Sequence, residues 1–195
     1  IDVVHVEQPT HLSCQPDVLS EYVEDLVTLL FSMNLVSDKE RVLLAQSISK
    51  IDTLSSFRDV DNVLYTILDD DSILSHREQL IIALSIIYSK KKKKAESLIS
   101  RFEQILEQTD KKTIKKISTV VSLCDIFHKT GTLLKPKSDS PDSLHLEVHV
   151  SKNHFPEVLL KQACTKLENT LGIKVKLMVY YEPSKQSHFK PIGIM

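Results

Sequence analysis

Residues 75–88 read SHREQLIIALSIIY and predict a buried helix. Ser75 and Glu78 have the spacing of a capping box, in which the hydroxyl and the carboxylate satisfy the first free amides of a helix. Apolar residues fill nearly all positions from Leu80 to Tyr88, which is typical of a helix that is covered on most sides. This segment therefore predicts a helix inside a protein core.

Amphipathic helices are predicted on both sides of this segment, because apolar residues recur there at spacings of three, four and seven. A second capping box, Ser37-Asp38-Lys39-Glu40, opens one of them. Gly131 has the position of a C-terminal cap after the last. Together with residues 75–88 they make about six helices, which indicates an all-helical domain. The other predicted helices are residues 18–33, 37–51, 60–68, 98–106 and 114–127.

A strand, helix, strand unit is predicted after residue 143. Apolar residues alternate with polar ones over 144–150 and again over 173–179, which is strand periodicity. Pro156 begins a helix between them, and Gly172 ends it. Two such strands in one sheet are parallel, and Val3, Val4 and Val6 are candidates for a third strand.

The predicted fold class is thus α+β and mainly α. Residues 132–143 contain two prolines and several Ser and charged residues, so they are interpreted as a linker. The predicted organisation is a helical domain, a linker, and a small β-α-β unit with a polar tail after residue 181: residues 1–131, 132–143 and 144–195.

Composition excludes several classes of protein. The 195 residues include only three Gly, too far apart to form a GxGxxG or Walker phosphate loop. No apolar run approaches the roughly 18 residues of a membrane-spanning helix, so no membrane association is expected. Three cysteines, Cys14, Cys124 and Cys164, lie in apolar patterns and predict buried thiols in a reducing, cytoplasmic setting. Because the chain begins at Ile1, we also expect a fragment of a longer protein.

Charge is distributed unevenly along the chain. Residues 1–89 have a net charge of -10 and residues 90–195 a net charge of +9. Two lysine clusters account for nine of the cations in the second part, and they are the candidate polyanion-binding residues. They are Lys90, Lys91, Lys92, Lys93, Lys94, Lys111, Lys112, Lys115 and Lys116.

Two interpretations of these lysines are open. Lysines at a helix C-terminus are favourable and can simply be solvated. Alternatively, closely spaced ammonium groups form a phosphate-binding face. Aromatic residues for stacking bases are nearly absent, which favours a polyphosphate or a nucleotide phosphate over single-stranded nucleic acid. The sequence predicts that the first run closes one helix and that the second opens another, with a helix of about 15 residues and 22 Å between them.

Metal and nucleophile motifs give little support for catalysis. His145, Glu147 and His149 share a strand face, a pattern that is more often the solvent side of a sheet than a metal site. HExxH, paired His-Cys spacings and the GxSxG elbow are all absent from the sequence. No metal and no cofactor are therefore expected on this chain.

Three segments carry a resemblance to a known family. Residues 41–52 (RVLLAQSISKID), residues 74–91 (LSHREQ through IIYSKK) and residues 122–130 (SLCDIFHKT) appear in an order and spacing that are similar to the C-terminal region of the exopolyphosphatase/guanosine pentaphosphate phosphohydrolase family. That region is a helical domain of the HD type followed by a strand, a helix and a strand, so the resemblance covers about residues 17–181.

The resemblance also implies that the HD site is degenerate. Lys50-Ile51 stands where the family has His-Asp, and Ser89 stands where it has a further histidine. Only Asp125 remains of the ligand set, and one carboxylate does not hold a divalent cation. In the family the hydrolytic site belongs chiefly to N-terminal domains, so this chain is expected to have no catalytic site of its own.

These features suggest two functions and argue against a third. The first is a non-catalytic accessory domain that binds polyphosphate or guanosine pentaphosphate, supports a homodimer and contacts the N-terminal catalytic domains of its parent chain. The second is a helical interaction or scaffold module with no phosphate ligand. The third, an active HD phosphohydrolase, lacks the His and Asp residues that it requires.

Overall fold

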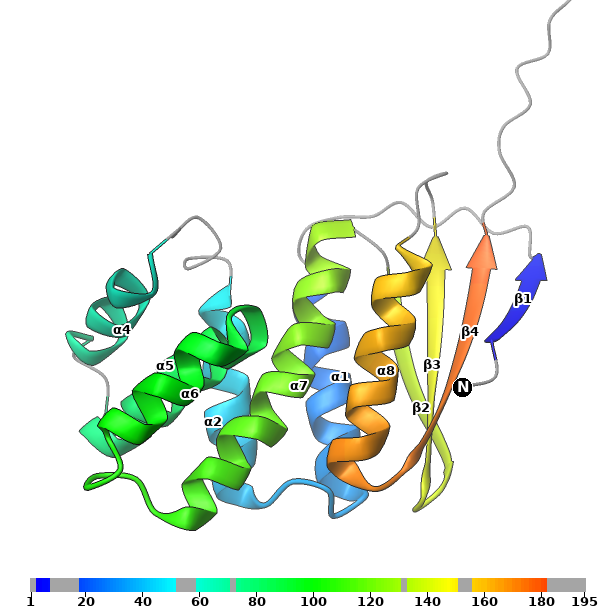
Figure 1. The fold of residues 1–195 in the computed structure, drawn as a ribbon. Coiled ribbons are helices and arrows are strands. Elements are labelled where there is room, and N and C mark those ends of the chain that lie inside the picture. The colour runs from blue at the N-terminus through cyan, green and yellow to red at the C-terminus, as the bar shows by residue number, and fades with distance from the viewer. Residues whose placement is uncertain are drawn as a thin grey trace, which may run out of the picture.

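The computed structural model has the expected class, α+β and mainly α (Figure 1). A helical part lies on one side and a four-stranded sheet on the other. The residues that the structure describes are 3–7, 18–51, 59–70, 73–130, 133–150 and 156–181.

Six helices precede residue 131 in the described part of the chain, in agreement with the predicted pattern. Each of the two predicted capping boxes is formed at the start of its helix, by Ser37 with Glu40 and by Ser75 with Glu78. The helices are α1 (Val18–Ser32), α2 (Asp38–Ser49), α4 (Val60–Leu68), α5 (His76–Lys90), α6 (Lys92–Arg101) and α7 (Gln108–Thr130).

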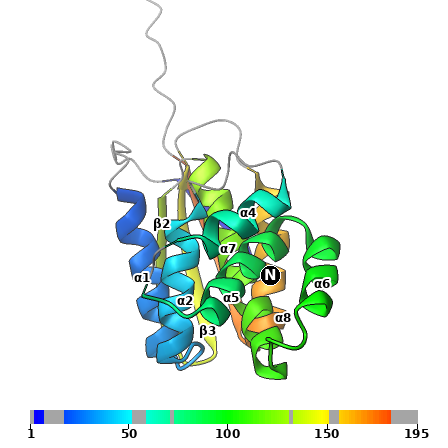
Figure 2. The same cartoon turned by 90° about the vertical axis from the view of Figure 1, so that its left-hand side faces the viewer.

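Helix α5 is the central helix of this part. Its residues from Gln79 to Ile87 are all buried, as the apolar run predicts. It contacts α2, α4, α6 and α7, and Figure 2 shows it among these helices, with α1 and α2 standing side by side. The composition of residues 75–88 therefore determines how the other helices are arranged around it.

The predicted β-α-β unit is confirmed. Strand β3 (Ser143–Val150) pairs in parallel with β4 (Lys174–Tyr181), and α8 (Glu157–Leu171) connects them. Gly172 ends α8 in the left-handed region, with φ of 70°, where a residue without a Cβ is favoured. The predicted additional strand is β1 (Val3–Glu7), which pairs in parallel with the other side of β4.

The predicted linker is wrong, because residues 133–140 form strand β2 (Leu133–Ser140). This strand pairs antiparallel with β3, so the sheet order is β1-β4-β3-β2. Leu134 is buried opposite Val148, whereas Lys135 and Lys137 face the other side. Pro136 is tolerated because β2 is an edge strand, where a missing N–H breaks no ladder on the free side.

The helix predicted over residues 98–106 ends earlier than expected. Helix α6 stops at Arg101, and Phe102 is its C-terminal cap. Leu106 is buried, but Ile105 is 52% exposed, so the apolar spacing continues across a turn and not along a helix. The amide of Leu106 donates to the carbonyl of Phe102, which closes this turn.

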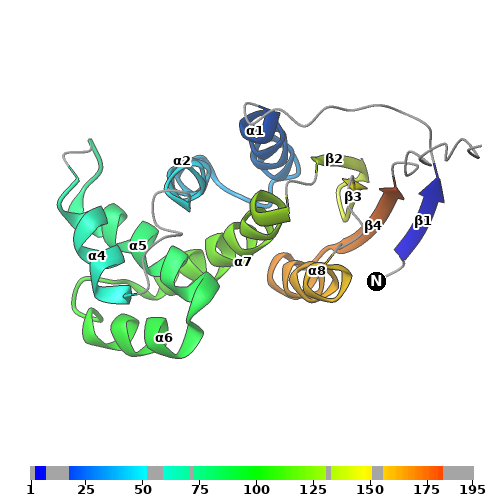
Figure 3. The same cartoon turned by 90° about the horizontal axis from the view of Figure 1, so that it is seen from above.

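One hydrophobic core joins the helices to the sheet. Leu84 of α5, Val121 of α7 and Leu146 of β3 belong to the same cluster of buried residues. Helix α8 packs on one face of the sheet, α1 lies against β2, and α7 contacts both α5 and α8 (Figure 3). Helix α7 is therefore the element that connects the helical part with the β-α-β unit.

A polar network fixes the first turn of α7 to the start of α5. Arg77 Nε donates to Asp110 Oδ2 at 2.8 Å, and its guanidinium also donates to Glu107 Oε1 at 2.6 Å. Burial would raise the pKa of Asp110, but hydrogen bonds from Arg77 and from the Glu107 amide lower it below the ordinary value of 3.8.

Truncation in α5 should destabilise the whole fold. We expect Leu84→Ala to lower the free energy of unfolding by about 2–5 kcal/mol, because Leu84 is fully buried and the substitution leaves a cavity. Leu159→Ala is the matched control, since Leu159 is 55% exposed. Urea denaturation of both variants is the measurement, and equal losses would contradict the assigned core.

The Arg77 network should make stability depend on acid pH. The pKa of Asp110 is lower in the folded chain than in the unfolded chain, so the stabilisation is present above about pH 4 and is lost as pH falls further. We expect Arg77→Met to be destabilising at pH 7 and to approach the wild type at pH 2–3. Urea denaturation across this pH range tests it, with Arg101→Met as the control, and a pH-independent difference would contradict it.

Candidate functional site

The second lysine cluster opens α7, as predicted. Lys111, Lys112, Lys115 and Lys116 all lie within its first nine residues. Thr109, Lys112, Thr113 and Lys116 follow one another at spacings of three, one and three, so they share one face of the helix. This face, which we call the α7 polar stripe, carries two hydroxyls and two ammonium groups.

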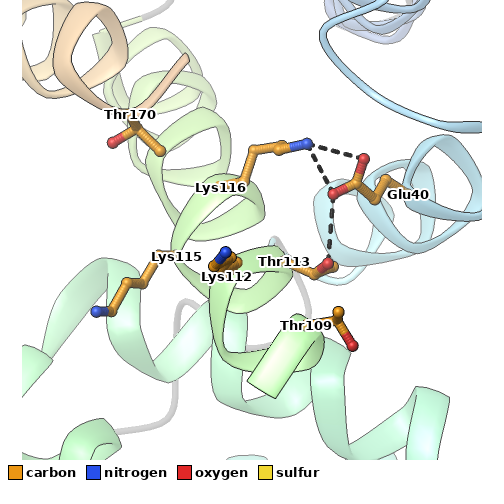
Figure 4. Close-up of a pocket in the computed structure, with 7 residues that line it drawn as sticks. All are labelled: Glu40, Thr109, Lys112, Thr113, Lys115, Lys116 and Thr170. Carbon is orange, nitrogen blue, oxygen red and sulfur yellow. Dashed lines mark hydrogen bonds and ion pairs between the residues drawn. The ribbon is translucent and has the colours of Figure 1, made fainter. Parts of the chain in front are cut away.

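A pocket of about 470 Å³ lies over the α7 polar stripe. Helix α2 contributes one wall and the end of α8 another, because both helices pack against α7 (Figure 4). The pocket is open to solvent and its lining is mostly basic and hydroxyl-bearing. The lining residues are Glu40, Thr109, Lys112, Thr113, Lys115, Lys116 and Thr170.

Glu40 is the acidic residue of this lining. Its Oε1 lies 2.8 Å from Lys116 Nζ and accepts a hydrogen bond from Thr113 Oγ1 at 3.3 Å. Its Oε2 accepts from the amide of Ser37 at 2.9 Å, which is the capping interaction of α2. Burial would raise the pKa of Glu40, but the bonds from Lys116 and Ser37 lower it, so this carboxylate is charged at neutral pH.

The three lysines of the lining point in different directions (Figure 4). Lys116 points toward Glu40, Lys115 points to the opposite side of α7, and Lys112 lies between them. Lys112 and Lys115 are exposed and form no ion pair within the described residues. Lys112 is thus the uncompensated cation nearest to the Lys116–Glu40 pair along the polar stripe.

The first lysine run lies at a junction of two helices and not at one helix end. Lys90 is in the last turn of α5, Lys91 caps α6, and Lys92, Lys93 and Lys94 form the first turn of α6. A helix N-terminus already has partial positive charge, so three more cations there are not stabilised by the helix dipole. The expectation that the whole run closes a helix is wrong, because the chain turns at Lys91.

Partners are unevenly distributed among these lysines. Lys90 Nζ lies 3.8 Å from Asp125, and Lys92 Nζ lies 3.9 Å from Glu96. Lys93 and Lys94 are exposed and have no ion pair in the part of the chain that the structure describes.

The two clusters are connected through α7. The expected intervening helix of about 15 residues is not present, since α6 has ten residues and residues 102–107 follow it. Lys90 nevertheless contacts α7 at Asp125, ten residues beyond Lys115, which corresponds to about 15 Å along the helix axis. Lys90 of the first run thus lies beside the same helix that carries the second cluster.

Asp125, the one residue that matches the family's ligand set, is surrounded by lysines. Its Oδ2 accepts from Lys129 at 2.6 Å, and Lys90 Nζ faces Oδ1. Lys50 donates to Asp70, and Ser89 donates to the Ile86 carbonyl. Among the described residues no group of three or more His, Cys, Asp or Glu side chains could hold a metal ion.

The polar residues of β3 show the predicted alternation, with every second residue buried. His145 lies 3.1 Å from Asp139, and Glu147 accepts from Lys137 at 2.7 Å. His149 stacks on Tyr180, with ring centroids 4.9 Å apart. Each of these residues therefore has its own partner and does not converge on a common centre.

The predicted burial of Cys124 and Cys164 is confirmed, while Cys14, Gly131 and the tail after residue 181 lie outside the described residues. Burial raises the pKa of both thiols to about 12. They are thus unsuited to act as nucleophiles at neutral pH.

The lysines of the pocket were predicted from the sequence, but its other lining residues were not. Thr109 and Thr113 each lie three positions before a lysine, but both precede the predicted helix of residues 114–127, so the earlier start of α7 at Gln108 is what places them on its face. Glu40 and Thr170 are 76 residues before Lys116 and 54 after it, and no local pattern connects them to α7.

No protein-family model and no curated protein matches this chain. Within the described segments, no helix is long and apolar enough to cross a membrane.

We expect the purified chain to release no phosphate from polyphosphate or guanosine pentaphosphate in the presence of Mg²⁺ or Mn²⁺. Lys90 and Lys129 occupy the surroundings of Asp125, so a divalent cation there would face two ammonium groups. A phosphate-release assay is the measurement. Turnover that Asp125→Ala abolishes would contradict this prediction.

Proposed function

We propose that this chain is a non-catalytic accessory module that binds polyphosphate or a related phosphate polyanion. In this proposal it belongs to an enzyme of the exopolyphosphatase/guanosine pentaphosphate phosphohydrolase type, whose hydrolytic site lies on N-terminal domains. Dimerisation and a cytoplasmic location are parts of the same proposal. The resemblance of residues 17–181 to that family supports it.

The observation that carries the proposal is the set of uncompensated lysines along α6 and α7. Lys93, Lys94, Lys112 and Lys115 are exposed and form no ion pair within the described residues. Like charges held this close repel one another, and a polyanion relieves that repulsion while it releases its own counterions. Lys90 meets α7 at Asp125, about 15 Å along the helix axis from Lys115, and this separation favours a long chain over a single nucleotide.

Ion pairs limit how much of the lysine charge is available. Lys90, Lys92 and Lys116 each face a carboxylate. The Lys92–Glu96 pair is exposed and contributes little to stability, so an incoming phosphate competes with it at small cost. The Lys90–Asp125 and Lys116–Glu40 pairs are partly buried and compete more strongly with a ligand. The binding surface is therefore defined by the unpaired lysines and is extended by the paired ones.

Binding of long-chain polyphosphate at two salt concentrations tests the proposal. We expect the variant Lys91→Glu, Lys93→Glu, Lys115→Glu to bind roughly tenfold or more weakly than the wild type, since each lysine near an anionic surface contributes about 1 kcal/mol. Wild-type affinity should also fall as salt rises.

The matched control reverses three exposed lysines outside both clusters, Lys166→Glu, Lys174→Glu and Lys176→Glu. It produces the same change in net charge and should weaken binding much less. Equal losses in the two variants, or affinity that is insensitive to salt, would favour a scaffold module with no phosphate ligand.

A further inference from the structure

The pocket over the α7 polar stripe is lined by one carboxylate side chain of the protein, that of Glu40. Glu40 comes from α2 and places its carboxylate on Lys116 and Thr113, two of the groups that would bind a phosphate oxygen. Glu40 neutralises the charge of Lys116, but the lining has further cationic and hydroxyl groups that could bind an anion. Lys112 lies on the same stripe, is exposed and forms no ion pair within the described residues. Thr109 is also exposed, and its Oγ1 donates only a long hydrogen bond, 3.5 Å, to Glu107 Oε2.

We infer that this pocket is a site for a short inorganic oligophosphate, or for the end of a polyphosphate chain, and that Glu40 occupies part of it until the ligand arrives. The inference rests on the proposed function, because it names a defined subsite within the polyanion-binding surface. Lys112 and Lys116 supply ammonium groups to the ligand, and Thr109 and Thr113 supply hydroxyl donors.

The chemistry of the lining favours a phosphate over other anions. Ammonium groups act as point charges for phosphate oxygens, and hydroxyls donate hydrogen bonds to the remaining oxygens. The lining has no aromatic and no large apolar residue that would bind a nucleobase. A volume of about 470 Å³ that opens to solvent also allows further phosphates to extend out of the pocket.

Glu40 connects the site to the fold, because its second oxygen caps α2. Oε2 accepts from the Ser37 amide at 2.9 Å while Oε1 faces Lys116. Lys116 Nζ also donates to Oε2 at 2.9 Å. A ligand that takes Lys116 and Thr113 therefore displaces contacts of both oxygens, but the bond from the Ser37 amide to Oε2 involves neither of these two residues. Occupation of the pocket thus requires no loss of helix structure.

The substitution Glu40→Gln separates these two roles. Glutamine at this position of a capping box still accepts from the Ser37 amide. It removes the charge that competes for Lys116, so we expect tripolyphosphate to bind at least about fivefold more tightly, because the Lys116–Glu40 pair is partly buried and is at least as strong as an exposed pair. Isothermal titration calorimetry with tripolyphosphate is the measurement.

The matched pair Lys112→Ala and Lys111→Ala tests whether the pocket or general surface charge binds the ligand. Both variants lose one lysine from the same turn of α7, but only Lys112 lines the pocket. We expect Lys112→Ala to weaken tripolyphosphate binding about tenfold, as the loss of a charged hydrogen bond does, and Lys111→Ala to weaken it much less. This comparison does not involve Glu40, so it is valid even if Glu40→Gln unfolds.

The results distinguish this inference from the proposed function. Equal effects of Lys111→Ala and Lys112→Ala, or no gain from a folded Glu40→Gln, would overturn the pocket even if long-chain polyphosphate binds the wild type. Conversely, absence of long-chain binding combined with pocket-dependent tripolyphosphate binding would overturn the proposed function and support the subsite.

Discussion

The packing of α7 is the constraint on which the rest of the structure depends. This helix has 23 residues, and its contacts with α5, α2 and α8 bury a large part of its surface. Because it contacts both the central helix α5 and the connecting helix α8, the helical part and the sheet share one core. The Arg77–Asp110 network then fixes where α7 begins, and with it the position of every lysine on its first turns.

Because α7 is buried on several sides, most of its polar residues lie on the part of its surface that remains accessible to solvent. Ile114, Ile117 and Val121 enter the core, so the polar residues of the first turns lie on the sides of α7 that the core leaves open, Thr113 and Lys116 on the side of α2. Thr119 of α7 meets Thr170 of α8 at 3.4 Å. The polar stripe is therefore the face of α7 that the core does not cover.

Much of the fold could be predicted from the sequence because its signals are local. Capping boxes at Ser37 and Ser75 and the alternation over 144–150 depend on residues a few positions apart, and they were confirmed. Strand β2 was not predicted, because Pro136 and the charged residues around it resemble a linker until β3 lies beside them. The end of α6 at Arg101 was not predicted either, because buried Leu106 continues the apolar spacing of the helix through the turn that follows it.

The candidate site shows the same limit in its chemistry. Lysine clusters can be found in the amino-acid sequence. Whether a given ammonium group is available to bind a ligand depends on carboxylates from segments that are distant in the sequence. Glu40 reaches Lys116 across 76 positions, and Asp125 reaches Lys90 across 35. Sequence therefore predicts where cations are abundant, and tertiary packing decides which of them remain free to bind a ligand. Within the segments that the structure describes, Lys112 lines the pocket and forms no ion pair, whereas Lys116 is paired with Glu40.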